Sequence, residues 1–319
     1  MDPEAFRSDL DGIPGALDDL ADAIAAGNMR WPIDGVPRRL VLTGMGSSYF
    51  AADVCARRLR AGGVDAVAEI ASAQIGWPPS SDTTVVAISA TGASVETLDA
   101  IAAHHPTSRV IALTNQPTSE LSAQAHATIE MHAGHERGGV ACRSFRNTIG
   151  ALLALEAQLL QTPSPVVTLR RAAEATAHLL ATVDSWLPEV LEAVDHPDGV
   201  WFLAPAERLS SALQGALMVR EGPRRRADGC ETGDWSHVDV YLTKTLDYRA
   251  VVYVGSRYDA AAAEWMNQRG SRSVAIGGPF PGANCIVSYP GADDTAVAVL
   301  VEPLIAELIA ASWWVAFHR

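Results

Sequence analysis

The most constraining feature of this chain is that short apolar runs alternate with helical segments, and that the alternation occurs twice. In the first half, apolar runs at 39–42 and 84–88 each lead into a loop rich in glycine and hydroxyl side chains. In the second half, the matching runs at 200–203 and 251–254 lead into loops without that chemistry. A duplicated scaffold whose loops differ in this way predicts one functional site, to which the two halves contribute different kinds of residues.

Two of the runs align between the halves with similar offsets. Ser108–Leu113 aligns with Ser271–Ile276 at an offset of 163 residues, and Val85–Ile88 aligns with Val251–Val254 at an offset of 166. Strands that alternate with helices are typical of a parallel, doubly wound sheet. The sequence therefore predicts an α/β protein with two tandem doubly wound parallel-sheet domains.

Periodicity and composition also suggest domain boundaries. Residues 1–37 show helical periodicity, and residues 38–162 hold the first set of strands. The stretch Thr162–Pro165 is rich in proline and serine, and we interpret 163–196 as a helical linker. The strand pattern then restarts, which predicts a second domain over 197–319.

Bulk composition excludes several classes of function. The chain has 319 residues, a formal net charge of −13 and a mean hydropathy near zero, so broad attraction to nucleic acid or to an anionic membrane is not expected. The apolar stretch Leu304–Phe317 contains Glu307 and is short for a membrane span, so we expect a buried helix. The four cysteines lack metal-ligand spacing, and the acidic N-terminus does not resemble a signal peptide. We expect a cytoplasmic protein with no metal and no cofactor.

Two loops carry the chemistry of the first half. Gly44–Ser48 follows one strand, and Ser89–Ser94 follows its neighbour with the same combination of glycine and hydroxyl groups. A single such loop could be an ordinary strand-to-helix turn with serine as the N-cap. Two of them at adjacent strand ends can converge on one phosphate. Neither is a Walker A loop or a GxGxxG fingerprint, so a nucleotide is not indicated.

Four ordered motifs carry a resemblance to a known family: Gly46–Tyr49, Ala68–Ser72, Ser89–Leu98 and Gly139–Phe145. Together they resemble the sugar isomerase (SIS) domain family, and the layout over 38–317 is similar to the isomerase half of glucosamine-6-phosphate synthase. That resemblance implies two flavodoxin-like αβα domains that bind a phosphosugar. The residues that it places at the substrate are Gly46, Ser47, Ser48, Ser89, Thr91, Ser94 and Val140. Ala90 departs from the glutamine usual in the family.

The same resemblance implies reactive groups in the second half. Glu221 lies where the family has a glutamate base, and His237 lies where a histidine opens the sugar ring. A carboxylate partly buried at a helix end has a raised pKa, which suits removal of a proton next to a carbonyl. The alternatives are a solvated Glu221 paired with Arg224 or Arg225, and a loop histidine with no catalytic role.

Weaker candidates are Glu136 and Asp234. Glu136 lies near a loop acid of the relatives, and Asp234 falls in the motif that precedes His237. In those relatives the histidine reaches the site from the neighbouring subunit, which implies a homodimer with a shared site.

Two departures from the family bear on the reaction. Met218 stands where synthase-like relatives carry a lysine, and the chain ends at Arg319 without the tail whose lysine reaches the sugar; no glutaminase half precedes it. Loss of both cations is expected to weaken isomerisation, because it removes positioned charge from the enediolate. We therefore favour, narrowly, a lyase that removes the carbon-2 proton of an (N-acetyl)hexosamine 6-phosphate and eliminates the carbon-3 group.

Two alternatives remain open. One is an aldose–ketose phosphosugar isomerase or a glucosamine-6-phosphate deaminase. The other is a non-catalytic sugar-phosphate sensor, which would act on a protein partner because no segment typical of DNA binding is present.

Overall fold

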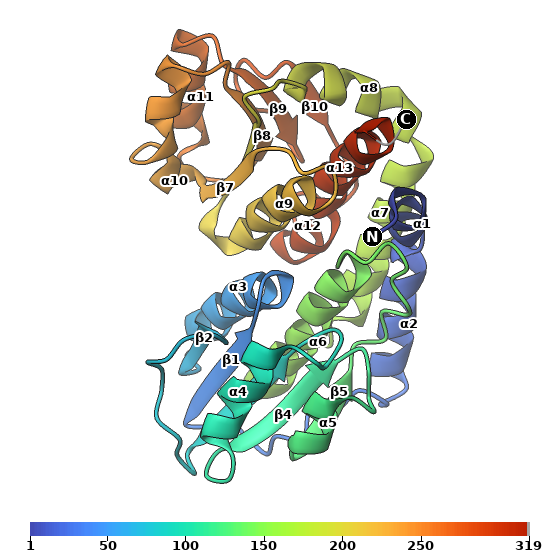
Figure 1. Cartoon of the computed structure of the whole chain (residues 1–319), viewed down its shortest axis with the longest axis vertical. Coiled ribbons are helices and arrows are strands. Elements are labelled where there is room, and N and C mark those ends of the chain that lie inside the picture. Colours follow the sequence, from blue (N-terminus) through green and yellow to red (C-terminus); the bar gives the residue numbers. More distant parts are fainter. Residues whose placement is uncertain (318–319) are drawn as a thin grey trace. The chain divides into compact units, whose positions relative to one another are not determined.

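Each half of the chain forms its own five-stranded parallel sheet. The computed structural model describes residues 1–317, coloured along the sequence in Figure 1. The first sheet contains β1 (Arg39–Gly44), β2 (Ala66–Ile70), β3 (Thr83–Ile88), β4 (Arg109–Thr114) and β5 (Ala127–Glu130). The second contains β6 (Val200–Ala204), β7 (Ala227–Glu231), β8 (Arg249–Tyr253), β9 (Arg272–Ile276) and β10 (Cys285–Val287).

The two sheets share one strand order. The first runs β2-β1-β3-β4-β5, and the second, read from its opposite edge, runs β7-β6-β8-β9-β10. Both have the 2-1-3-4-5 order of flavodoxin-like sheets, with parallel pairing throughout. The predicted fold class is confirmed. The order also makes β3 equivalent to β8 and β4 equivalent to β9, which are the strands that the sequence repeat aligned.

Helices fill the connections between strands. Those before the second sheet are α1 (Pro3–Asp11), α2 (Ile13–Ala25), α3 (Ser47–Ala61), α4 (Val95–His104), α5 (Glu120–Gln124), α6 (Arg143–Leu160), α7 (Val166–Ala181) and α8 (Val183–Val194). Those that follow are α9 (Leu209–Glu221), α10 (Thr232–Trp235), α11 (Asp259–Gln268), α12 (Thr295–Val301) and α13 (Pro303–Phe317), with the 3₁₀ turns η1 (Ala206–Arg208) and η2 (Asp239–Lys244).

The segment 222–249 lacks the apolar runs that mark strands, so the sequence by itself predicts a long loop there, and this prediction is wrong. It contains β7, α10 and η2. The strand escaped notice because its sequence, Ala-Asp-Gly-Cys-Glu, has none of the β-branched or aromatic residues that mark strands. Gly229 has a packing reason to be there. A Cβ on it would lie 2.6 Å from the Ala212 carbonyl oxygen, so α9 lies directly against β7.

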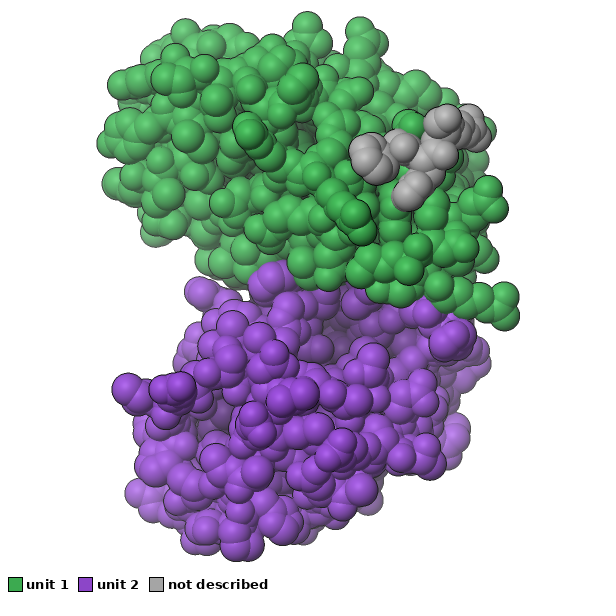
Figure 2. Space-filling model, viewed as in Figure 1, with its two compact units in different colours: residues 1–14, 137–140, 171–319 green, residues 15–136, 141–170 purple. Residues whose placement is uncertain are grey.

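The chain divides into two compact units (Figure 2). The first-sheet unit comprises residues 15–136 and 141–170, and the second-sheet unit comprises residues 1–14, 137–140 and 171 onward. The N-terminal segment and the helical linker are thus each divided between the two units. The domain boundaries inferred from the sequence stay a prediction.

Each unit has helices on both faces of its sheet. In the first-sheet unit, α3 packs on β1, β2 and α6, while α4 and α5 pack on each other and on β3 and β4 (Figure 1). In the second-sheet unit, α9 packs on β6, β7 and α13, while α10 contacts α11. The inner strands β1, β3, β4, β6, β8 and β9 are apolar and fully buried at their centres. Each buried valine or leucine side chain contributes about 1.5–3 kcal/mol.

One helical run within residues 1–317, Thr295–Ala316, is long and apolar enough to cross a membrane by length and composition. It is longer than the sequence indicated because α12 and α13 follow each other directly, separated at Glu302. However, 83% of its most apolar window is buried, and α13 packs on α1, α8 and α9. The expectation of a buried core helix is confirmed.

Candidate functional site

The two hydroxyl-rich loops begin side by side in the first sheet. Gly44, the last residue of β1, is the register partner of Ile88, the last residue of β3. This is the topological switch point, since β2 lies on one side of β1 and the later strands lie on the other. Doubly wound sheets bind ligands at the carboxyl ends of the strands at this point. The fold therefore brings both loops to the place expected for a ligand.

Glycines allow the first loop to pack tightly against the second strand. A Cβ on Gly44 would lie 2.8 Å from the Ser48 Cβ and 2.9 Å from the Ile88 carbonyl oxygen, which is too close for any side chain. Gly46 is the N-cap of α3 with φ of 51°, and it has no side chain to accept from the first helical amides. Helix N-termini attract anions through these amides and through the helix dipole. Ser47 and Ser48, both half-buried, open the helix at this point.

In the second loop, the hydroxyl groups hold the turn itself. The Gly92 amide donates to Ser89 Oγ at 3.1 Å, and the Ala93 amide donates to Thr91 Oγ1 at 3.4 Å. Ser94 is the N-cap of α4, as predicted: its Oγ accepts from the Thr97 amide at 3.4 Å.

These side chains differ in exposure and in remaining hydrogen-bonding capacity. Ser89 is buried, Ser94 is half-buried and Thr91 is exposed. The Ser94 hydroxyl donates to Glu96 Oε2 at 2.9 Å. Hydrogen bonds from the Glu96 amide and from Ser94 lower the pKa of this carboxyl, so an ionised carboxylate stands beside the loop. Thr91 is thus the most accessible hydroxyl of the second loop.

Glu136 has a role that the sequence did not reveal. One of its oxygens accepts from the backbone amides of Cys142 and Arg143, at 2.7 Å each, and of Ser144 at 3.1 Å. The other accepts from Ser144 Oγ at 2.6 Å. The Glu136 carboxylate therefore caps the N-terminus of α6. Sequence rules for helix caps examine the residues directly at a helix start, and they miss Glu136 because a loop separates it from α6.

Val140 is the one predicted binding residue that belongs to the other compact unit. Its side chain is buried. The predicted contact between Val140 and the substrate stays a prediction.

Glu221 is the last residue of α9, in the second-sheet unit. Burial raises the pKa of its carboxyl, opposed by the charge of Arg220, which is the direction that the sequence predicted for a helix-end base. Among the described residues 1–317, Glu221 forms no ion pair with Arg224 or Arg225. Arg225 instead binds Asp195 at 2.6 Å and lies 3.8 Å over the ring of Trp313, and Arg224 is exposed.

One turn before Glu221, Met218 is fully buried. Gln214 Nε2 donates to its sulfur at 3.5 Å. The position where the resemblance implied a lysine is thus part of the apolar core here, and residue 218 brings no charge to the carboxylate.

Asp234 and His237 lie at the short helix α10 and just after it. Both side chains are exposed, and the His237 amide donates to the Asp234 carbonyl at 2.8 Å. The Asp234 amide donates to Glu231 Oε2, the cap of α10. Within residues 1–317, no hydrogen bond or ion pair joins Glu221 to His237.

Comparison with known proteins identifies the first-sheet unit. Residues 36–159 match the model of the SIS domain. The chain carries a SIS domain. The resemblance inferred from the four sequence motifs is therefore confirmed over this part of the chain.

Related proteins extend the likeness beyond the SIS domain. The glutamine–fructose-6-phosphate aminotransferase (isomerizing) of Sulfolobus acidocaldarius is 25% identical over 241 residues, which are 75% of this chain and 39% of that protein. The chain thus spans about two fifths of the length of this relative.

Solved structures share the fold of the whole chain. The C-terminal domain of the glucosamine-fructose-6-phosphate aminotransferase of Francisella tularensis matches with a TM-score of 0.82 at 16% identity, covering 97% of this chain and 96% of that one. The tagatose-6-phosphate ketose/aldose isomerase of Escherichia coli matches with a TM-score of 0.77 at 18% identity, covering 96% and 92%. These likenesses show a common fold.

The SIS domain contains most of the predicted binding residues: Gly46, Ser47, Ser48, Ser89, Thr91, Ser94 and Val140. Glu221, Asp234 and His237 lie outside it, in the second-sheet unit. Within residues 1–317, no group of three or more His, Cys, Asp or Glu side chains could hold a metal ion.

Proposed function

We propose that this protein is an enzyme that acts on a hexosamine 6-phosphate, with the phosphate held by the SIS domain. The observation that carries the proposal is the pair of hydroxyl-rich loops at the switch point of the first sheet, beside a helix whose N-cap has no side chain. The names of the related aminotransferases and of the tagatose-6-phosphate isomerase support a phosphosugar as the substrate class.

Glu221 is the proposed base. Its raised pKa brings the carboxyl closer to neutrality, so the carboxylate can remove a proton and return it. In the open-chain sugar, the carbon-2 proton lies next to the carbon-1 carbonyl. We assign His237 the proton transfers of ring opening, and we expect it to reach the site from the second subunit of a homodimer.

Elimination is the favoured outcome. Glu221 takes the carbon-2 proton and the C–H electron pair becomes the double bond between carbons 2 and 3. The C–O bond at carbon 3 breaks, and the leaving hydroxyl takes the proton back from Glu221 and departs as water. Met218 supports this choice, because the buried thioether offers no charge to stabilise the enediolate that isomerisation needs. An N-acetyl group on carbon 2 also disfavours an imine route.

Isomerisation or deamination is the second candidate. It is favoured by the related aminotransferases, whose name includes an isomerizing activity, and by the isomerase with the same fold. These reactions and the elimination all begin with the same carbon-2 proton transfer. Elimination then expels the carbon-3 group, isomerisation places a proton on carbon 1, and deamination does the same and then hydrolyses the carbon-2 imine to release ammonia.

We further propose a cytoplasmic location. All four cysteines are free, and burial raises the pKa of the Cys55 and Cys230 thiols to about 12. Thiols of this kind are unreactive structural groups, as in proteins of reducing compartments.

The decisive experiment is a panel of hexose, hexosamine and N-acetylhexosamine 6-phosphates, followed by proton NMR in heavy water. We expect deuterium at carbon 2 of recovered substrate, from return of a solvent proton, and, for N-acetylglucosamine 6-phosphate, an unsaturated product that absorbs in the ultraviolet. A ketose phosphate, or ammonia from glucosamine 6-phosphate, would establish the second candidate instead. Binding of a sugar phosphate with neither carbon-2 exchange nor any product would identify a sensor.

A further inference from the structure

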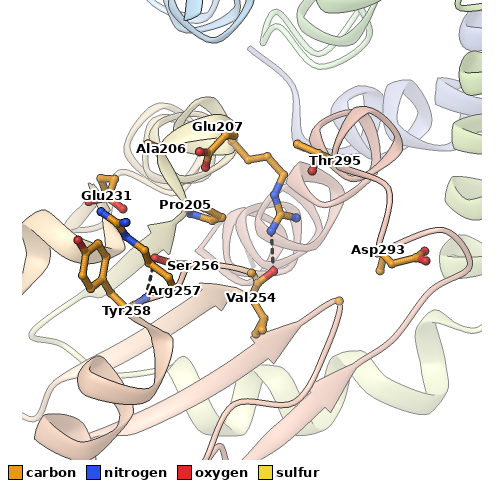
Figure 3. Close-up of a pocket in the computed structure, with 14 residues that line it drawn as sticks. Pro205, Ala206, Glu207, Glu231, Val254, Ser256, Arg257, Tyr258, Asp293 and Thr295 are labelled. Atoms are coloured by element: carbon orange, nitrogen blue, oxygen red, sulfur yellow. Dashed lines mark hydrogen bonds between the residues drawn. The ribbon is translucent and has the colours of Figure 1, made fainter. Parts of the chain in front are cut away.

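Helix α9, whose last residue is Glu221, is fixed at its start by a buried charge pair. Arg208, the N-cap of α9, donates from Nη1 to Oε2 of Glu302 at 2.6 Å, and Glu302 lies between α12 and α13. Arg208 Nη2 donates to the Val254 carbonyl oxygen, at the wall of a cavity of about 880 Å³ (Figure 3). Both charged side chains are buried, so separating them would leave an unpaired charge in the core. The start of α9 is therefore held in one place against α12 and α13.

Two glycines set the contact between the rest of α9 and α13. A Cβ on Gly215 would lie 2.9 Å from the Ala306 Cβ, and a Cβ on Gly222, the C-cap of α9, would lie 2.8 Å from the Trp314 ring. Both distances are shorter than side chains tolerate, so only glycine fits at either position. The two glycines are about two helical turns apart and lie on the same side of α9. The end of α9 thus rests directly on the indole of Trp314.

Trp314 offers a rigid surface to this turn. It is buried, and its ring packs on the buried ring of Phe6 from α1, with centroids 5.8 Å apart. Helix α1 is held in turn by the segment 137–140 of the same unit, because the Gly138 amide donates to Asp9 Oδ2 at 2.7 Å. A buried ring that packs on a second buried ring has little freedom to move away from its neighbours.

The neighbouring tryptophan holds the other end of the turn that follows Glu221. The Arg225 guanidinium lies 3.8 Å over the ring of Trp313, and the Arg225 amide donates to the Val219 carbonyl oxygen at 3.1 Å. Arg224 has φ of 57°, the left-handed conformation that reverses the chain direction. The two adjacent tryptophans of α13 therefore contact both ends of one short turn.

We propose that Trp314 is a positioning residue for Glu221: through Gly222 it fixes where the last turn of α9 lies and so where the carboxylate points. This inference rests on the proposed function, in which Glu221 is the base. A displacement of about 1 Å can lower the rate of a positioned reaction about 10²-fold. Substrate binding should be spared, because the proposed phosphate loops belong to the other compact unit.

The first test adds a methyl group at the contact and then removes the ring that it meets. Gly222→Ala should lower kcat for the sugar phosphate by about 10- to 100-fold, with KM within about twofold of the wild type. Adding Trp314→Leu to that variant should restore kcat by about fivefold or more, since the smaller side chain makes room for the methyl group. Gly15→Ala, at an exposed helical glycine with open space around it, is the matched control and should not change kcat.

The second test does not depend on turnover. Carbon-13 NMR of the Glu221 carboxyl, assigned by its loss in Glu221→Gln, measures the pKa of this group in each variant. Burial raises that pKa in the native chain, so a displaced turn that exposes the carboxyl should move it back toward 4.5. We expect this change in Gly222→Ala and in Trp314→Leu, and none in Gly15→Ala.

Circular dichroism establishes that each variant is folded. Where Gly222→Ala does not fold, Trp314→Phe takes its place, because it keeps a buried ring but withdraws it from Gly222. It should lower kcat about threefold to tenfold without changing KM.

The inference is overturned if Gly222→Ala keeps the wild-type kcat, if the double variant is no more active than Gly222→Ala, or if neither single variant moves the pKa of Glu221. A wild-type protein that turns over no sugar phosphate defeats the proposed function instead. The pKa comparison then still decides whether Trp314 positions Glu221.

Discussion

The carboxyl edges of the two sheets have the same topology and opposite chemistry. At the first edge, α3 begins after a glycine N-cap, and serine and threonine hydroxyls line the neighbouring loop. At the second edge, the carboxylates of Glu231 and Asp294 accept from amides at the starts of α10 and α12, and Asp259 accepts from the amides of Gly255 and Ser256 in the loop before α11. Strand order thus fixes where the strand-to-helix loops meet, whereas the side chains in those loops decide which backbone amides stay available to a ligand.

The largest expected effect tests whether the two units divide binding from chemistry. Glu221→Gln keeps the shape of the side chain and removes the base, so turnover of the sugar phosphate should fall by about 10²- to 10⁴-fold. Substrate affinity, measured by calorimetry, should stay within about twofold if the phosphate is held in the other unit. Glu192→Gln is the matched control. A variant with full turnover would remove Glu221 from the mechanism.

The next effect concerns the glycine that shapes the first edge. Gly92 has φ of 64°, and a Cβ on it would lie 2.0 Å from Ser119 Oγ. Gly92→Ala should therefore lower the free energy of unfolding by about 2–4 kcal/mol, from left-handed strain and crowding together.

Gly63→Ala is the control for crowding, since Gly63 has φ of 86° with open space around it. It should cost only the strain, about 1–2 kcal/mol. Urea unfolding followed by tryptophan fluorescence measures both, and equal losses would mean that the loop relaxes around the new methyl group.

A smaller effect tests which hydroxyls receive the phosphate. Ser48→Ala and Thr91→Val should each weaken binding of inorganic phosphate by about tenfold or more, the range for a lost hydrogen bond to a charged group. Thr107→Val, at an exposed turn after α4, should not change the affinity. Phosphate affinity that is unaffected by both loop variants would erase the contrast between the two edges.

The smallest effect concerns the pH dependence of kcat/KM. Burial raises the pKa of Glu221 above its ordinary value of 4.5, and the base works only when ionised. The rate should therefore rise with pH through a limb that lies above pH 4.5, and kcat/KM measured from pH 4 to 8 locates it. A limb at or below pH 4.5 would mean that the base is a solvated carboxylate.

Local sequence signals predicted most of the fold. Nine of the ten strands in residues 1–317 coincide with apolar runs that the sequence shows. The strand that the sequence did not predict is β7, which contains Asp228 and Gly229 where a strand would show Val or Ile. Its place in the sheet follows from the backbone of α9 lying against Gly229, a contact between segments distant in sequence. The same limit applies to Glu136, whose four hydrogen bonds to the start of α6 depend on how an intervening loop folds.

The sequence by itself determined the duplicated αβα order and the two hydroxyl-rich loops, because strand hydrophobicity and glycine loops are local properties of the chain. The tertiary structure alone decided which charges remain available. Asp294 became a helix cap, Asp259 came to accept from two loop amides, Arg208 became the partner of a buried carboxylate, and Met218 entered the core. Those outcomes depend on burial and on hydrogen bonds between elements, which exist only once the sheets have formed.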